Sequence, residues 1–245
     1  FGEPLLLAEF LDHELPNWQE THEKADVSSA CLSLARELAT RINSATAVKL
    51  VGIVATALLT TPRQTIEEKH LLNQIKLLTD LAISLEYSDA YTVTNKSPQE
   101  ILDKAITIAG IDRVEHPFGV TISASNKLSV LLTYYCNNIS HLFALPSLIA
   151  RYIKTERDTT LEEIESFCEH LYPFLASEYF LRWSPAEVGT QCRKIIDLFT
   201  ASGLVIRQDK NISAATQGSD RYASLNELSE IVEPTLERFH IVLAL

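Results

Sequence analysis

One stretch decides the fold class: Leu128–Tyr152, with the sequence LSVLLTYYCNNISHLFALPSLIARY. It is long, apolar at both ends and polar in the middle, which predicts one buried helix. We expect Pro146 to kink or end this helix, because proline lacks a backbone donor and clashes with the preceding turn. On such a helix Tyr134, Asn138 and His141 would share a face, since they stand at i, i+4 and i+7.

Polar side chains inside an apolar helix are costly unless they are hydrogen-bonded. The stretch therefore predicts a buried network that fixes helix packing. Contact with a ligand or a neighbouring domain is a second interpretation, and direct catalysis is a third. The residues concerned are Tyr134, Tyr135, Asn137, Asn138 and His141.

Helices are predicted along most of the remaining chain. Val27–Ile42 has apolar residues at helical spacing, with Asp26 as a candidate cap. Ala45–Leu59 is too short to span a bilayer and predicts a buried helix. S/T-x-x-E capping boxes, in which hydroxyl and carboxylate each accept a backbone N–H, mark four further helix starts. They are Thr65…Glu68, Ser97…Glu100, Ser184…Glu187 and Ser224…Glu227.

Strand signals are few. Gly119–Ala124 alternates like a short strand, and Leu204–Arg207 and Asn211–Ser213 flank an Asp-Lys turn that is typical of a small hairpin. We predict a mainly α-helical domain over residues 25–245, with a short strand and this hairpin. Residues 184–213 are winged-helix-like, and residues 1–24 are an irregular start and a linker.

Composition limits the partners and the chemistry. With 21 Lys and Arg against 32 Asp and Glu, the net charge is −11. This is unfavourable for nucleic-acid binding, which needs a basic face. The four cysteines form no C-x-x-C pair, so we expect free thiols and no metal. The usual sequence motifs of nucleotide, zinc-protease and serine-hydrolase sites are absent, and no cofactor is expected.

A basic cluster follows the long apolar stretch. Arg151, Lys154 and Arg157 are spaced by three, and an apolar helix with a basic end can lie on an anionic membrane surface. The alternative is a solvated helix end whose cations favour the negative end of the helix dipole.

Several motifs occur together in a recognisable order. Leu132–His141 is LTYYCNNISH, followed by Leu145-Pro146-Ser147-Leu148. Thr40–Asn43 is TRIN, and Phe1–Pro4 is FGEP. HLYPFL, EYFLRW and SGLV stand at 170–175, 178–183 and 202–205. This series resembles the large bacterial glycerol-3-phosphate acyltransferases over nearly the whole chain.

The resemblance implies an enzyme that moves a fatty acyl group from acyl-CoA or acyl-carrier protein to the 1-hydroxyl of glycerol 3-phosphate. It implies a place on the cytoplasmic face of the bacterial inner membrane. It also implies that residues 1–24 end an α/β acyltransferase domain, and that the partners are that catalytic domain, the membrane surface and the acyl donor. The family's H-x-x-x-x-D, in which histidine acts as general base, is absent from this chain. We therefore expect no catalytic residue here. Cys136 stands where the family usually has Arg.

Two other functions fit the sequence. The chain could be a non-catalytic helical interaction module whose motifs serve packing alone. It could also be a winged-helix regulator. The helix Pro185–Ser202 mixes Arg193 and Lys194 with Glu187 and Asp197, which is a weak signal for DNA binding.

Overall fold

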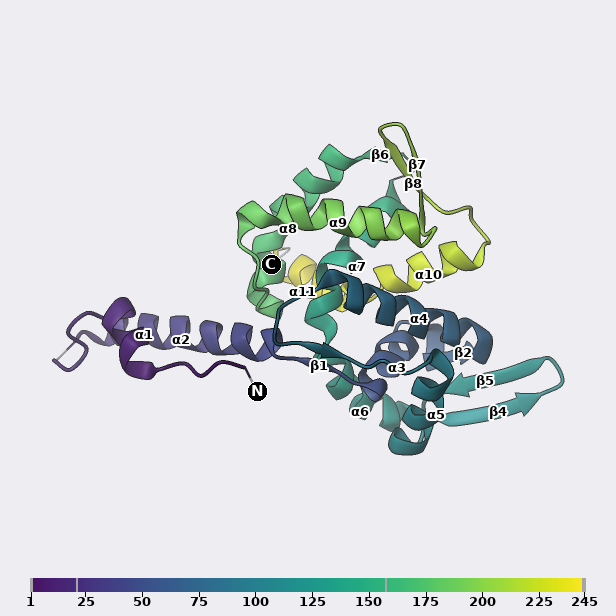
Figure 1. Ribbon diagram of the computed structural model, residues 1–245, viewed down its shortest axis with the longest axis horizontal. Coiled ribbons are helices and arrows are strands. Elements are labelled where there is room, and N and C mark those ends of the chain that lie inside the picture. The colour runs from purple at the N-terminus through teal and green to yellow at the C-terminus, as the bar shows by residue number, and fades with distance from the viewer. Residues whose placement is uncertain (1, 21, 157, 244–245) are drawn as a thin grey trace.

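The structure is a computed structural model that describes residues 2–20, 22–156 and 158–243. Within these residues the chain is mainly α-helical, as predicted, with short strands between the helices (Figure 1). The α-helices are α1 (Leu7–Glu14), α2 (Lys24–Ser44), α3 (Leu50–Leu59), α4 (Glu68–Leu85), α5 (Pro98–Ala109), α6 (Asn126–Asn137), α7 (Ser140–Thr155), α8 (Leu161–Tyr179), α9 (Val188–Ala201), α10 (Asp220–Ser229) and α11 (Glu233–Leu243).

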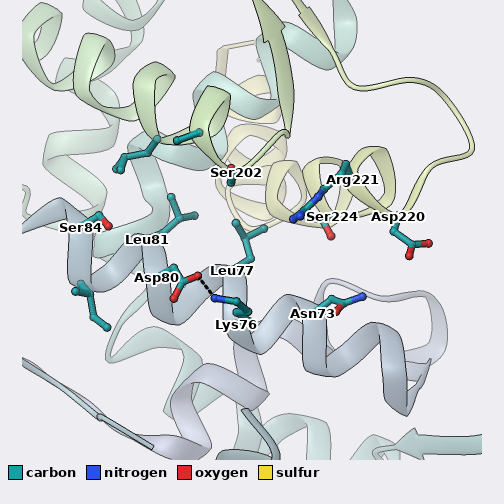
Figure 2. Close-up of a pocket in the computed structure, with 13 residues that line it drawn as sticks. Asn73, Lys76, Leu77, Asp80, Leu81, Ser84, Ser202, Asp220, Arg221 and Ser224 are labelled. Atoms are coloured by element: carbon teal, nitrogen blue, oxygen red, sulfur yellow. Dashed lines mark hydrogen bonds and ion pairs between the residues drawn. The ribbon is translucent and has the colours of Figure 1, made fainter. Parts of the chain in front are cut away.

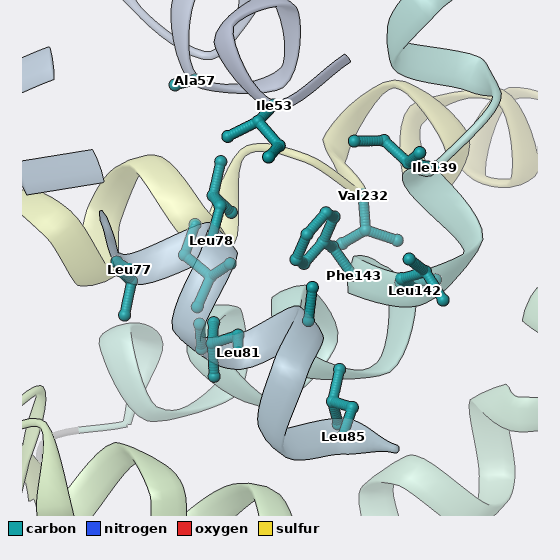
Figure 3. Close-up of a cluster of buried hydrophobic side chains, with 14 of the residues drawn as sticks. Ile53, Ala57, Leu77, Leu78, Leu81, Leu85, Ile139, Leu142, Phe143 and Val232 are labelled. Atoms are coloured by element: carbon teal, nitrogen blue, oxygen red, sulfur yellow. The ribbon is translucent and has the colours of Figure 1, made fainter. Parts of the chain in front are cut away.

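Two helices form the centre of the core. The inner part of α3 is buried from Val51 to Leu58, and α7 is buried along most of its length. Apolar side chains from α3, α4, α7 and the α10–α11 connection meet between them (Figure 3). Ile53, Leu78 and Phe143 all lie in this cluster, and Figure 3 shows them pointing toward a common centre. The predicted buried helix in Ala45–Leu59 is thus confirmed over Leu50–Leu59.

The predicted single helix over Leu128–Tyr152 is wrong: the stretch forms two helices. The first, α6, ends at Asn137, and α7 begins at Ser140. The break lies at Asn138 and Ile139, whereas Pro146 sits inside α7. Adjacent asparagines favour a break because their side chains compete with the backbone for hydrogen bonds. Ile139 then enters the core, with 1% of its surface exposed.

Two of the four predicted capping boxes exist. The Ser97 and Ser184 boxes are formed with Glu100 and Glu187. Thr65 instead begins strand β2, and Ser224 lies inside α10, which Ser219 caps. Asp26 is no cap either, because α2 begins two residues earlier at Lys24. A box that we did not predict, Thr160 with Glu163, starts α8.

The strands form three small sheets. The predicted hairpin is confirmed as β7 (Val205–Gln208) and β8 (Asn211–Ala214), and β6 (Thr159–Thr160) joins it in the order β6-β8-β7. The predicted short strand is β5 (Gly119–Ser123), which pairs antiparallel with β4 (Asp112–His116) and β2 (Thr65–Glu67). A parallel pair joins β1 (Ala47–Val48) to β3 (Thr92–Val93). Short 3₁₀ turns cover Pro62–Gln64 and Pro185–Glu187.

The first two helices project from the body as an arm. Figure 1 shows α1 folded back on α2, with the free end of both helices far from the other elements. Within the arm only Ala30 is buried. The root of the arm, around Asn43, joins the body. The division into two domains near residue 24 remains a prediction, as does the winged-helix character of residues 184–213.

Candidate functional site

His141 is the centre of a buried network at the root of the arm. It is the second residue of α7 and is 2% exposed. Its Nε2–H donates to the Asn43 carbonyl at 3.2 Å, and the Asn43 side-chain amide donates to the Tyr179 carbonyl at 2.7 Å. Burial lowers the pKa of His141 to about 4, although the bond to Asn43 opposes this. The imidazole is therefore neutral near pH 7 and acts as a donor.

Tyr87 contacts the His141 ring and connects it with Trp183 and Arg182. The two rings meet edge to face at 5.3 Å, and Tyr87 meets Trp183 in the same way at 5.1 Å. The Tyr87 hydroxyl accepts the Arg182 backbone N–H at 3.3 Å. Burial raises the pKa of Tyr87 to about 12, so the phenol stays protonated. The buried Tyr172 hydroxyl donates to the Trp183 carbonyl at 2.6 Å. These contacts thus join residues of four motifs: TRIN, the NN-containing stretch, HLYPFL and EYFLRW.

A cleft of about 690 Å³ lies beside this network. Its walls come from the ends of α2 and α3, the α6–α7 junction, the end of α8, the α10–α11 connection and the first half of α11. Three of the motifs converge there from positions far apart in the chain. The lining residues from these motifs are Asn43, Thr133, Cys136, Asn137, Ser140, His141, Glu178, Tyr179 and Phe180.

Two pairs of polar side chains interact with each other within the cleft. Glu178 forms an ion pair with Arg238, and the Tyr179 hydroxyl lies 2.8 Å from the Thr235 hydroxyl. Burial raises the pKa of Tyr179 and that of the Cys136 thiol, so both stay neutral. Within the described ranges no cluster of His, Cys, Asp and Glu could hold a metal ion. Among the described residues, the Cys136 thiol accepts a hydrogen bond from the Thr56 hydroxyl at 3.5 Å, and His141 is bonded to the Asn43 carbonyl.

The structure brings together only some of the five network candidates. His141 is buried and Tyr135 is half-buried, whereas Tyr134, Asn137 and Asn138 are exposed. The expectation that both asparagines are buried is therefore wrong. It assumed one unbroken helix, and the break at Asn138 turns the two amides outward. Asn137 still lines the cleft, and the Asn138 carbonyl accepts a bond from Thr46 at the root of the arm.

The predicted basic cluster is not a free cationic patch. Arg151 donates to Glu233 at 2.9 Å, and Lys154 donates to Glu230 at the same distance. Both acids lie just before or at the start of α11, so the two cations fasten α7 to the C-terminal helices. Arg157 lies outside the described residues. Sequence spacing could not reveal these pairs, because the partners stand about 80 positions later.

A second cavity, of about 730 Å³, lies between α4, α9 and α10 (Figure 2). Its floor includes Leu77 and Leu81, and its rim carries the ion pair of Lys76 with Asp80 (Figure 2). Arg221 points into it from α10. Only Ser202, of the motif residues, lines this cavity. The cleft beside His141 therefore remains the stronger candidate site.

Sequence reasoning missed part of the cleft. Thr56 of α3, Thr60 directly after it and Arg238 of α11 line the cleft, and the Tyr87 ring contacts the His141 ring. None of these residues stands in a motif quoted above. The apolar sequence of Ala45–Leu59 predicted a buried helix there, but not that this helix lines the cleft. No helix in the part of the chain that the structure describes is long and apolar enough to cross a membrane.

Comparison with known proteins agrees with the order of the motifs. The family model described as glycerol-3-phosphate acyltransferase C-terminal region matches residues 1–245. Relatives named glycerol-3-phosphate acyltransferase include one from Xylella fastidiosa, 32% identical over 254 residues, and one from Pseudomonas fluorescens, 32% identical over 251 residues. All of this chain is covered, but only 29% and 30% of those relatives. The chain belongs to the family of the C-terminal regions of glycerol-3-phosphate acyltransferases.

Proposed function

We propose that this chain is the non-catalytic C-terminal part of an enzyme that acylates the 1-hydroxyl of glycerol 3-phosphate, with acyl-CoA or acyl-carrier protein as donor. The family membership and the names of the relatives support this proposal. The chain spans less than a third of those relatives. The residues that take the hydroxyl proton and hold the phosphate lie in the remaining part.

The role of this region is structural: it holds the catalytic part in place. One observation carries this proposal. The network of His141, Asn43 and Tyr87 fixes the root of the arm, and the segment Gly2–Pro4 lies against the same root. A methyl group on Gly2 would lie 3.1 Å from the Ala45 side chain, and Arg41 donates to the Pro4 carbonyl at 3.2 Å. A catalytic part joined to this segment would therefore meet the cleft and the arm first.

The first test is an activity assay of the purified chain. We expect no turnover with glycerol 3-phosphate and either acyl-CoA or acyl-carrier protein, because no positioned base takes the hydroxyl proton. Loss of general-base catalysis alone is typically worth roughly 10²- to 10⁴-fold. The full-length protein, assayed in parallel, should be active. Robust turnover by this chain alone would contradict the non-catalytic assignment, and an inactive full-length protein would contradict the acyltransferase assignment.

We propose contact with a membrane surface as a second function, carried by α6. The outer side of α6 exposes Val130, Leu131 and Tyr134, with 75%, 47% and 66% of their surfaces accessible. No Asp or Glu occurs between Glu115 and Glu156, although the chain has 32 acidic residues. An apolar face with a tyrosine and no acids is suited to the interface of an anionic bilayer.

A further inference from the structure

One side of α2 carries an apolar stripe. Leu32, Ala35, Ala39 and Ile42 follow each other at intervals of three, four and three residues. This is the spacing with which one helix packs along another. Leu32 is 74% exposed and Ile42 is 69% exposed. The two alanines between them would allow a second helix to approach closely.

Packing within the described residues does not account for the stability of the arm. Of the 21 residues of α2 only Ala30 is buried, and no residue of α1 is buried. Helices in proteins gain most of their stability from burying an apolar face. The α1 helix covers a different side of α2, along Val27, Ala30 and Leu34, which line the apolar groove between the two helices. The stripe therefore lacks the partner that its spacing requires.

Three observations indicate what covers the stripe. Gly2–Pro4 lies against the root of the arm, close to the end of the stripe at Ile42. More than two thirds of each relative lies outside the match, and the matched region is described as C-terminal. Acidic residues outnumber basic ones in residues 2–44, which is unfavourable for contact with an anionic bilayer. A preceding domain tethered at this root would meet the stripe at a high effective concentration.

We propose that the stripe Leu32–Ala35–Ala39–Ile42 packs against a helix of the catalytic part that precedes this region in the full-length protein. The arm is then a clamp, held by the His141 network at one end and by this helix pair along its length. This inference rests on the proposed function and names the surface through which the two parts meet.

The test compares amide hydrogen exchange in α2 between the full-length protein and this chain alone. We expect slow exchange in the full-length protein and fast exchange in the isolated chain, because the stripe is covered only in the former. The double variant Leu32→Asp/Ile42→Asp, made in the full-length protein, should restore fast exchange in α2. Ser29→Asp, which adds one negative charge at an exposed position beside the stripe, should leave the exchange slow.

Both substituted side chains are exposed, so the double variant should not change the unfolding midpoint of the isolated chain. A lower midpoint would show that the stripe packs within this chain and would overturn the proposal. Equally fast exchange in both wild-type proteins would also overturn it. So would a dimer of the isolated chain, seen by sedimentation and abolished by the double variant, because a second copy would then be the occupant. Protection of α2 in an inactive full-length protein would support the clamp while contradicting the acyltransferase assignment.

Discussion

At the scale of single residues, the buried histidine is the group whose charge matters most. His141 is neutral in the folded chain because burial lowers its pKa to about 4. Its ring touches Tyr87, and its one hydrogen bond goes to the Asn43 carbonyl. A proton on this ring would be a buried charge without an acidic partner, which is costly. Low pH should therefore loosen the root of the arm before it loosens the rest of the molecule.

We expect the free energy of unfolding to fall as the pH drops from about 6.5 to about 4. In this window the unfolded chain binds the His141 proton and the folded chain does not, so stability rises with pH. The effect of this one group would be at most about 3 to 4 kcal/mol, since one pKa unit corresponds to about 1.4 kcal/mol. Denaturant titrations at several pH values would measure it.

His141→Gln keeps a donor near the position of Nε2 but does not titrate. Its stability should depend less on pH over this window than that of the wild type. His170, which is exposed, provides the matched control: His170→Gln should keep the full pH dependence. Identical pH profiles for the wild type and His141→Gln would contradict the assignment of this dependence to His141.

At the scale of elements, the contact between α3 and α6 positions the cleft. Gly52 of α3 lies directly under the end of α6. A methyl group there would be 3.2 Å from the Ile139 side chain and 3.3 Å from the Tyr135 carbonyl oxygen. Both distances are tighter than ordinary van der Waals contact, and the backbone carbonyl has little room to move. Glycine at this position therefore allows the two helices to approach closely, and with them the lining residues Thr56 and Cys136.

We expect Gly52→Ala to destabilise the chain. Replacing glycine by alanine stabilises a helix by about 1 kcal/mol, but overpacking typically costs about 1–3 kcal/mol. We therefore expect a net loss of stability. Gly189→Ala in α9 is the matched control, because its new methyl group would meet only side-chain atoms at 3.6 Å or more. That variant should be neutral or more stable. Thermal and denaturant unfolding of both variants would decide, and a stabilised Gly52→Ala would refute the close-packing argument.

At the scale of the whole molecule, three exposed features bear on the proposed functions: the arm, the cleft and the outer face of α6. The end of α6 connects them, because Asn138 touches the root of the arm through Thr46 and Asn137 lines the cleft. We propose that the catalytic part contacts the arm and that a membrane contacts the outer face of α6. The negative net charge does not prevent this, since the exposed face of α6 carries no acid.

We expect weak binding of the chain to vesicles that contain phosphatidylglycerol, through the outer face of α6. Val130→Asp should reduce this binding, because it places a negative charge against an anionic surface. Ile83→Asp, at an exposed apolar residue of α4, should not reduce it. Co-sedimentation with vesicles would measure both. Equal binding of the wild type and Val130→Asp, or no binding at all, would contradict the membrane proposal.

The sequence predicts those features that depend on residues close together along the chain. The helical class, the hairpin around Asp209 and the Ser97 and Ser184 caps follow from local chemistry, and all are confirmed. The errors come from long-range packing. Asn138 is exposed because the chain breaks where Ile139 enters the core against Gly52, which stands 87 positions earlier. The pairing of β6 with β8 is likewise set by tertiary contacts. Which residues would line the cleft could not be deduced, since its walls come from helices along the whole chain.

The two tryptophans of the chain lie in different regions. Trp18 lies in the connection between α1 and α2, where it is partly exposed and donates to Asp12 at 2.9 Å. Trp183 is buried beside Tyr87. Their fluorescence should therefore report separate events, with the emission of Trp18 following the arm and that of Trp183 following the loss of the core. A Trp18→Phe variant would leave a single optical probe of global unfolding, and the difference spectrum would isolate the signal of the arm.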